Sequence, residues 1–112
     1  MPVNGAFNEI REQLAEWPGL EIQPHRFGGM EWNFGQREIG HIHGDALVDI
    51  PFPRKVRDEA LAARLAEPHH VLPESGWVSV WLREAADVPK AVALLRRSYE
   101  LALSQKERMK SL

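Results

Sequence analysis

REIGHIHGDALVDI, residues 37–50, has the pattern of two β-strands joined by a tight turn. Isoleucine, valine and leucine recur on both sides of Gly44 and Asp45, and β-branched residues favour strands. The Gly44-Asp45 pair is a two-residue turn signal of the kind that joins the strands of a hairpin. We therefore expect strands over residues 37–43 and 46–50 that pair in antiparallel fashion.

Two further strands are predicted before this hairpin, and one after it. Residues 20–27 form a short extended run. In residues 30–34 apolar and polar side chains alternate, which is the period of a half-buried strand. Glycine-containing turns separate these runs from each other and from residue 37, so the strands up to residue 50 form an antiparallel meander. Residues 77–82 form the last predicted strand.

Three helices complete the predicted fold. Apolar residues at helical spacing indicate a first helix that begins at Asn4 as N-cap, includes Trp17 and ends at Pro18, a second from about Pro53, and a third from about Asp87. The expected order is α-β-β-β-β-α-β-α. This order predicts an α+β fold, with an antiparallel sheet of about five strands and three helices packed on it.

The composition restricts the class of protein. The chain has 112 residues, of which 44% are hydrophobic and 27% charged, and its formal net charge is −2. These values predict one globular domain over residues 1–112. The lack of cysteine excludes a disulfide scaffold, a thiolate zinc site and a cysteine nucleophile. Without a predicted signal peptide, membrane span or basic surplus, we expect a cytoplasmic protein that binds neither membranes nor nucleic acid.

Four of the five histidines fall between residues 41 and 70. Because alternate residues of a strand share a face, His41 and His43 are expected on one face together with Arg37 and Ile39. Glu38 is expected on the other face unless the strand bulges. Two imidazoles on one face can converge on a ligand, a water molecule or a metal ion.

A proline-rich loop places His69 and His70 directly before Trp77. Since adjacent residues normally point apart, we expect one of the two imidazoles to turn inward toward His41 and the other to face solvent. Trp77 is the ring best placed to contact a ligand. His25, in the turn PHRFGG, is expected at the rim of the same pocket.

The His-x-His spacing also allows a metal site. Asp45 and Asp49 follow His41 and His43 closely, as acidic ligands do in cupins, and imidazole with carboxylate suits iron, zinc, manganese or nickel. Cupins are all-β proteins, whereas this chain has three predicted helices. A His-ligated metal enzyme is therefore kept as an alternative, and the preferred interpretation assigns no metal ligands.

Four segments together resemble the luciferase-domain family: REIGHIHGD, LVDIPFP, AEPHHVLPESGWV and LLRRSYELAL. The family includes small stand-alone bacterial proteins, which the chain resembles over residues 17–103, and the luciferase of luminous fungi, over residues 37–103. The fungal enzyme adds dioxygen to a hydroxylated styryl-pyrone without an organic cofactor. The resemblance thus implies an oxygenase-like enzyme that acts on an enolic or aromatic, pyrone-like molecule, with dioxygen as co-substrate and no cofactor.

The resemblance also implies roles for particular residues. The paired histidines would supply a base, Arg37 would hold an anion, Glu38 would orient a neighbour and Trp77 would form a wall. The predicted catalytic residues are His41, His43, His70, Arg37 and Glu38, and the predicted substrate-binding residues are Trp77, His69, His25 and Asp49.

A weaker resemblance suggests a function of another class. A Trp-led strand, a short turn and a helix containing SYEL are similar to the end of the YjbR-like family, whose fold resembles a DNA-binding domain. The second alternative is therefore a non-enzymatic binding or regulatory module with a protein or nucleic-acid partner. The mild acidity of the chain disfavours nucleic acid, and the sequence does not specify an oligomeric state.

Overall fold

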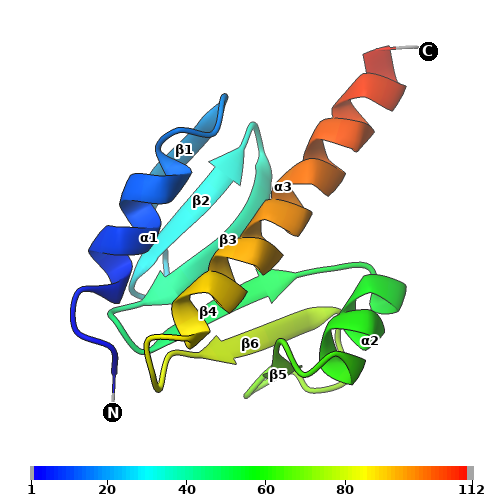
Figure 1. The fold of residues 1–112 in the computed structure, drawn as a ribbon. Helices are drawn as coiled ribbons and strands as arrows, with labels where there is room; N and C mark the ends of the chain where they lie inside the picture. Colours follow the sequence, from blue (N-terminus) through cyan, green and yellow to red (C-terminus); the bar gives the residue numbers. More distant parts are fainter. Residues whose placement is uncertain (1, 111–112) are drawn as a thin grey trace.

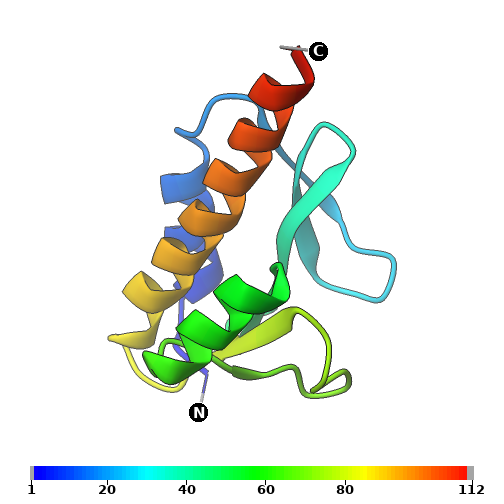
Figure 2. The same cartoon turned by 90° about the vertical axis from the view of Figure 1, so that its right-hand side faces the viewer.

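A computed structural model describes residues 2–110 as a six-stranded antiparallel sheet with helices packed on one face (Figure 1). The strand order is β1-β2-β3-β4-β6-β5. α1 and α3 lie side by side on one face of the sheet, and α2 lies at its β6 end (Figure 2). The elements are α1 Ala6–Leu14, β1 Leu20–Pro24, β2 Met30–Phe34, β3 Arg37–His43, β4 Leu47–Pro51, α2 Arg54–Ala62, β5 Glu67–Pro68, β6 Trp77–Trp81 and α3 Asp87–Lys110.

The predicted α+β class and element order are confirmed, with one strand added. β5 has only two residues, which pair with Val78 and Ser79 of β6. Two residues are too few to show the alternation by which a strand is predicted. The loop that carries His69 and His70 begins directly after β5, so the pairing of β5 with β6 fixes where the loop starts.

The bounds of β4 and β6 differ from the prediction by one residue, and those of α1 and β1 differ by more. α1 begins after Gly5, which has a φ of 81°, and not after Asn4. It ends at Leu14, because the backbone N–H of Trp17 bonds to the Leu14 carbonyl in a tighter turn ahead of the proline. β1 ends at Pro24 and not at residue 27, because residues 25–29 close into a turn.

The apolar core lies between the sheet and the helices. Ile42, Val48 and Leu95 are at most 1% exposed there. Gly40 allows α3 to approach β3, since a Cβ at Gly40 would lie 2.7 Å from Cδ2 of Leu95 and 3.0 Å from the backbone oxygen of Asp49. A hydroxyl also joins the two elements, as Ser98 Oγ donates to the Ile39 carbonyl over 2.9 Å.

A β-bulge in β3 changes which side chains share a face. Trp32 of β2 pairs with Gly40 and the next residue of β2 pairs with Glu38, so Ile39 is an extra residue on β3. Ile39 is fully buried in the core, and Glu38 joins the face of His41. The prediction that Ile39 and Arg37 share the face of His41 is therefore wrong.

Arg37 lies on the helix-covered side of the bulge. Its Nη1 donates to Oε1 of Gln105 on α3 over 2.6 Å. Arg37 also borders a second hollow, together with Phe34 and Lys106, that is separate from the histidines. The bulge thus exchanges the expected positions of Arg37 and Glu38.

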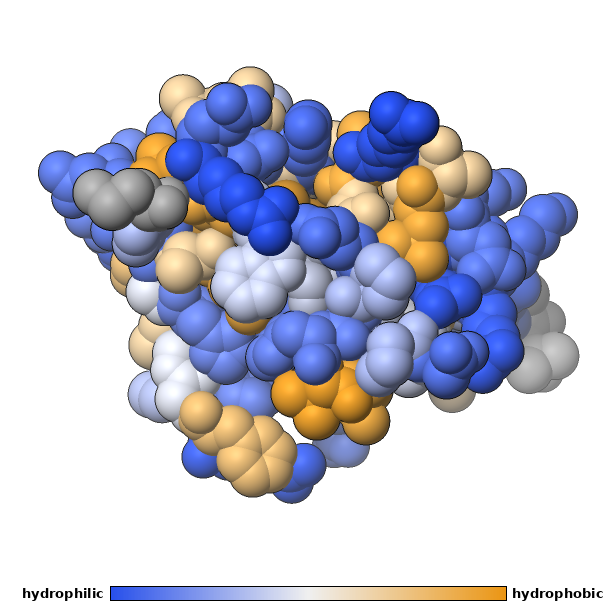
Figure 3. All heavy atoms as spheres, turned by 90° about the horizontal axis from the view of Figure 1, so that it is seen from below, coloured by the Kyte–Doolittle hydropathy of each residue, from blue (hydrophilic) through white to orange (hydrophobic). Residues whose placement is uncertain are grey.

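The outer surface carries both apolar and hydrophilic side chains (Figure 3). No helix among residues 2–110 is long and apolar enough to cross a membrane. On the face shown in Figure 3, apolar side chains form small groups among hydrophilic ones.

Candidate functional site

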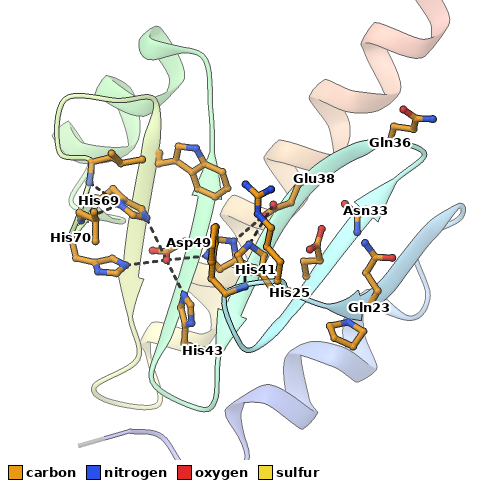
Figure 4. A pocket seen from close by; sticks show the side chains of 17 residues that line it. Gln23, His25, Asn33, Gln36, Glu38, His41, His43, Asp49, His69 and His70 are labelled. Carbon is orange, nitrogen blue, oxygen red and sulfur yellow. Dashed lines mark hydrogen bonds and ion pairs between the residues drawn. The ribbon is translucent and has the colours of Figure 1, made fainter.

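Four imidazole rings converge on one carboxylate oxygen at the centre of the open sheet face (Figure 4). Asp49 of β4 is fully buried, and its Oδ2 lies 3.2–3.5 Å from four Nε2 atoms. β3 contributes two of these rings and the loop before β6 contributes the other two. The four residues are His41, His43, His69 and His70.

Strand pairing explains why Asp49 occupies this position. Asp49 pairs with His41 on one side and with Ser79 on the other, so the three side chains form a row across the sheet. Ser79 Oγ donates to Oδ1 of Asp49 over 2.7 Å. Burial raises the pKa of Asp49, but hydrogen bonds from His41 and Ser79 outweigh burial and lower it below its usual range. Asp49 is therefore a buried anion.

His41 bridges two carboxylates. Its Nδ1 lies 2.7 Å from Oε2 of Glu38, and its Nε2 lies 3.2 Å from Oδ2 of Asp49. Burial lowers the pKa of His41, but the hydrogen bonds to Asp49 and Glu38 outweigh burial and raise the pKa to about 9. The site thus stabilises positive charge between Glu38 and Asp49.

His25 reaches the site from the turn between β1 and β2. Its ring stacks on that of His41 with 4.1 Å between centroids, and its Nε2 lies 3.9 Å from Oε1 of Glu38. Gly29 allows this turn to lie directly against β3, because a Cβ at Gly29 would lie 2.1 Å from the Ile42 carbonyl oxygen. Gly29 also has a φ of 76°, which a larger residue adopts only with strain.

Both loop histidines point inward. The rings of His69 and His70 stack with 4.4 Å between centroids, and each Nε2 lies near Oδ2 of Asp49. The prediction that one of them faces solvent is therefore wrong. The backbone N–H groups of Val71 and Leu72 both donate to Nδ1 of His69, which curls the loop and removes the alternation expected of an extended chain.

His43 and His69 are neutral in this environment. Burial lowers the pKa of His43, and the positive charge of His41 lowers it further. Burial likewise lowers the pKa of His69, and the nearby His70 and His41 add to the effect. In both residues these causes outweigh the attraction of Asp49.

A half-open cavity of about 890 Å³ lies over the four imidazoles. Trp77 forms a wall, with its ring 5.3 Å from that of His41. Three exposed apolar side chains border the cavity from two loops: Phe27, Val71 and Leu72, which are 74%, 67% and 51% exposed. The cavity therefore combines an ionic floor with an apolar rim.

Eight of the nine predicted site residues lie together at this cavity. Arg37 does not, and Arg26 is the sole arginine or lysine that lines the cavity within the described part of the chain. Ser79 was not selected from the sequence, although strand alternation places it on the face of Trp77. Four polar residues of the lining were also missed, namely Gln23, Glu31, Asn33 and Gln36.

Three groups of side chains have the spacing of metal ligands. In each group, one ligand atom from each residue lies within 4.8 Å of the others. His41 belongs to two of the groups, and so does Asp49. The groups are His25 with Glu38 and His41, His41 with His43 and Asp49, and Asp49 with His69 and His70.

Comparisons with known proteins agree with the sequence resemblance. No curated protein and no solved structure matches the chain. The family model of the luciferase domain matches residues 36–98, which is more than half of the chain and runs from the turn before β3 into α3. The match contains the bulge, Asp49 and the histidine loop, whereas His25 lies outside it. On this match, the chain belongs to the luciferase-domain family.

Proposed function

We propose that this protein is a small-molecule enzyme of the oxygenase type. It acts without an organic cofactor on an enolic or phenolic aromatic compound, with dioxygen as co-substrate. The observation that carries the proposal is the convergence of four imidazoles on the buried Asp49 carboxylate at the floor of a cavity. Imidazole is the side chain most often used to take and return protons in enzymes.

The cavity suits a flat aromatic molecule. Its volume of about 890 Å³ lies within the range of roughly 300–1,000 Å³ that is typical of small-molecule sites. Trp77 and the exposed side chains of Phe27 and Leu72 offer apolar surface to a ring. A hydroxyl group on that ring would reach the imidazoles, whereas the ring itself would stay at the rim.

His70 is the residue placed to take the substrate proton. Its side chain is 35% exposed, and its Nε2 lies 3.2 Å from Asp49, which orients the ring. Removal of a proton from the enolic hydroxyl leaves an enolate. The enolate carbon then adds dioxygen to form a peroxide, and the proton remains on the imidazole. Arg26 supplies positive charge at the rim, the role that the family resemblance implied for Arg37.

Oxygen uptake and ligand binding test the proposal together. Hydroxypyrones and substituted phenols are titrated while the tryptophan fluorescence is recorded, and oxygen consumption is measured with an electrode. We expect binding and oxygen uptake by the wild type, and binding without uptake by His70→Gln. Arg37→Ala is the matched control and should retain both, since Arg37 lies outside the cavity.

Two results would contradict the proposal. Binding without oxygen uptake by the wild type would favour a binding module over an enzyme. An unchanged rate in His70→Gln would remove His70 from its role as base.

A further inference from the structure

We propose that His41, His43 and Asp49 bind one divalent ion of a first-row transition metal, and that His25 and His69 are excluded from the ligand set. The use of such a metal in turnover rests on the proposed function, whereas its binding does not. The selection follows from the hydrogen bonds at the Nδ1 atoms of His25, His41 and His69.

Two histidines cannot offer Nε2 to a metal. The backbone N–H of Phe27 donates to Nδ1 of His25, and two backbone N–H groups donate to Nδ1 of His69. A backbone N–H is always a donor, so both Nδ1 atoms present their lone pairs. Each of these two rings then carries its proton on Nε2, whereas a metal needs a lone pair at that nitrogen. Two of the three groups with ligand spacing are thereby eliminated.

His41 has the opposite arrangement. Its Nδ1 lies 2.7 Å from Oε2 of Glu38, and because a carboxylate only accepts, Nδ1 is the donor. A cation bound at Nε2, in the direction of Asp49, would then displace only the proton that His41 carries at that atom, while the hydrogen bond from Nδ1 to Glu38 stays intact. A carboxylate behind the ligating ring is the usual support of metal-bound histidines, since it fixes the ring and increases its basicity.

The distances in the remaining group fit coordination. Oδ2 of Asp49 lies 3.2 Å from Nε2 of His41 and 3.3 Å from Nε2 of His43. Metal bonds to nitrogen and oxygen of about 2.0–2.2 Å place neighbouring ligands about 3.0–3.5 Å apart. The other oxygen of Asp49 accepts from Ser79, so Oδ2 is the ligand atom. The carboxylate of Asp49 brings negative charge to the cation, and Glu38 lies behind the ring of His41.

The ligand set indicates the kind of metal. Two imidazoles with one carboxylate suit iron, cobalt, zinc or manganese better than magnesium or calcium, which prefer oxygen ligands. Three protein ligands leave further coordination positions for small molecules. These positions border the cavity, because His41, His43 and Asp49 all line it. His70 stays outside the ligand set and is available as the base.

Cobalt binding tests the ligand set directly. Metal-free protein without an affinity tag is titrated with Co²⁺, and the visible absorbance of the ion is recorded. We expect saturation at about one Co²⁺ per chain, and a loss of at least about 100-fold in affinity for His43→Gln and Asp49→Asn. His69→Gln is the matched control: its ring also touches Asp49, yet it should bind Co²⁺ with wild-type stoichiometry. Circular dichroism of each variant confirms that it is folded.

The proposal is overturned if the wild type does not bind Co²⁺ stoichiometrically, or if His69→Gln loses binding as His43→Gln does. If Asp49→Asn does not fold, the comparison of His43→Gln with His69→Gln decides. The two proposals fail separately. Oxygen uptake that persists without any bound metal would remove the metal from turnover, and Co²⁺ binding by a protein that never consumes oxygen would contradict the oxygenase function alone.

Discussion

On the side of the sheet that α3 covers, Ile42 and Val48 are 1% and 0% exposed and pack among apolar side chains. On the opposite side of the same two strands, His41 and Asp49 are nearly as buried, at 7% and 0%, and carry charge. Burial alone therefore does not separate core from site. What separates them is that the buried polar residues of the open face, His41, Asp49 and Ser79, each have a hydrogen bond or a partner of opposite charge.

The largest expected effect on stability comes from the covered face. Leu95 is fully buried against Gly40, so Leu95→Ala removes apolar contacts and leaves a cavity. We expect the free energy of unfolding to fall by about 2–5 kcal/mol, measured by urea denaturation. Co²⁺ affinity of the folded fraction should stay at the wild-type value. A large loss of affinity would show that the two faces are not independent.

The next effect distinguishes Glu38 from Arg37, the two residues whose faces the bulge exchanges. Glu38→Ala removes the partner of Nδ1 of His41 and should weaken Co²⁺ binding by about 10–100-fold. Arg37→Ala removes a contact with α3 and should leave the Co²⁺ affinity unchanged. Titration of both variants gives the comparison. Equal losses would mean that the two side chains act on the same face after all.

A smaller effect is expected where α3 meets the back of the site. Gly40→Val forces a side chain against Leu95 and the backbone oxygen of Asp49, and should cost about 1–3 kcal/mol of stability. The double variant with Leu95→Ala should lose less than the sum of the two single variants, because the alanine makes room. Strict additivity in urea denaturation would contradict this contact.

The smallest effect concerns the turn between β6 and α3. Asp87 accepts the backbone N–H groups of Arg83 and Glu84, and although burial raises the pKa of Asp87, these bonds lower it overall. The contribution of Asp87 to the free energy of unfolding is therefore present above its unfolded pKa of about 4 and is lost as the pH falls. Asp87→Ala should cost about 1 kcal/mol at neutral pH. Thermal melts of both proteins should converge in acid, and a constant difference would contradict the assignment.

Much of the fold follows from local patterns, because the strands and helices of this chain carry clear periodicities. Placing His41 and His43 on one face required only strand alternation. The position of Glu38 could not be predicted in this way, because the bulge arises from pairing with β2 and not from the residues of β3. The inward turn of both His69 and His70 depends on backbone hydrogen bonds within a loop, for which the sequence has no periodic signal.

The close approach of Gly29 to β3 has a consequence for the energetics of recognition. Contacts within the chain seat the turn that carries His25 against the Ile42 carbonyl, so its backbone is ordered during folding. A ligand that contacts His25 or Phe27 then does not bear the entropy cost of ordering that segment. The shape of this part of the cavity is therefore set when the chain folds, and ligands of a different shape are disfavoured without any rearrangement of the turn.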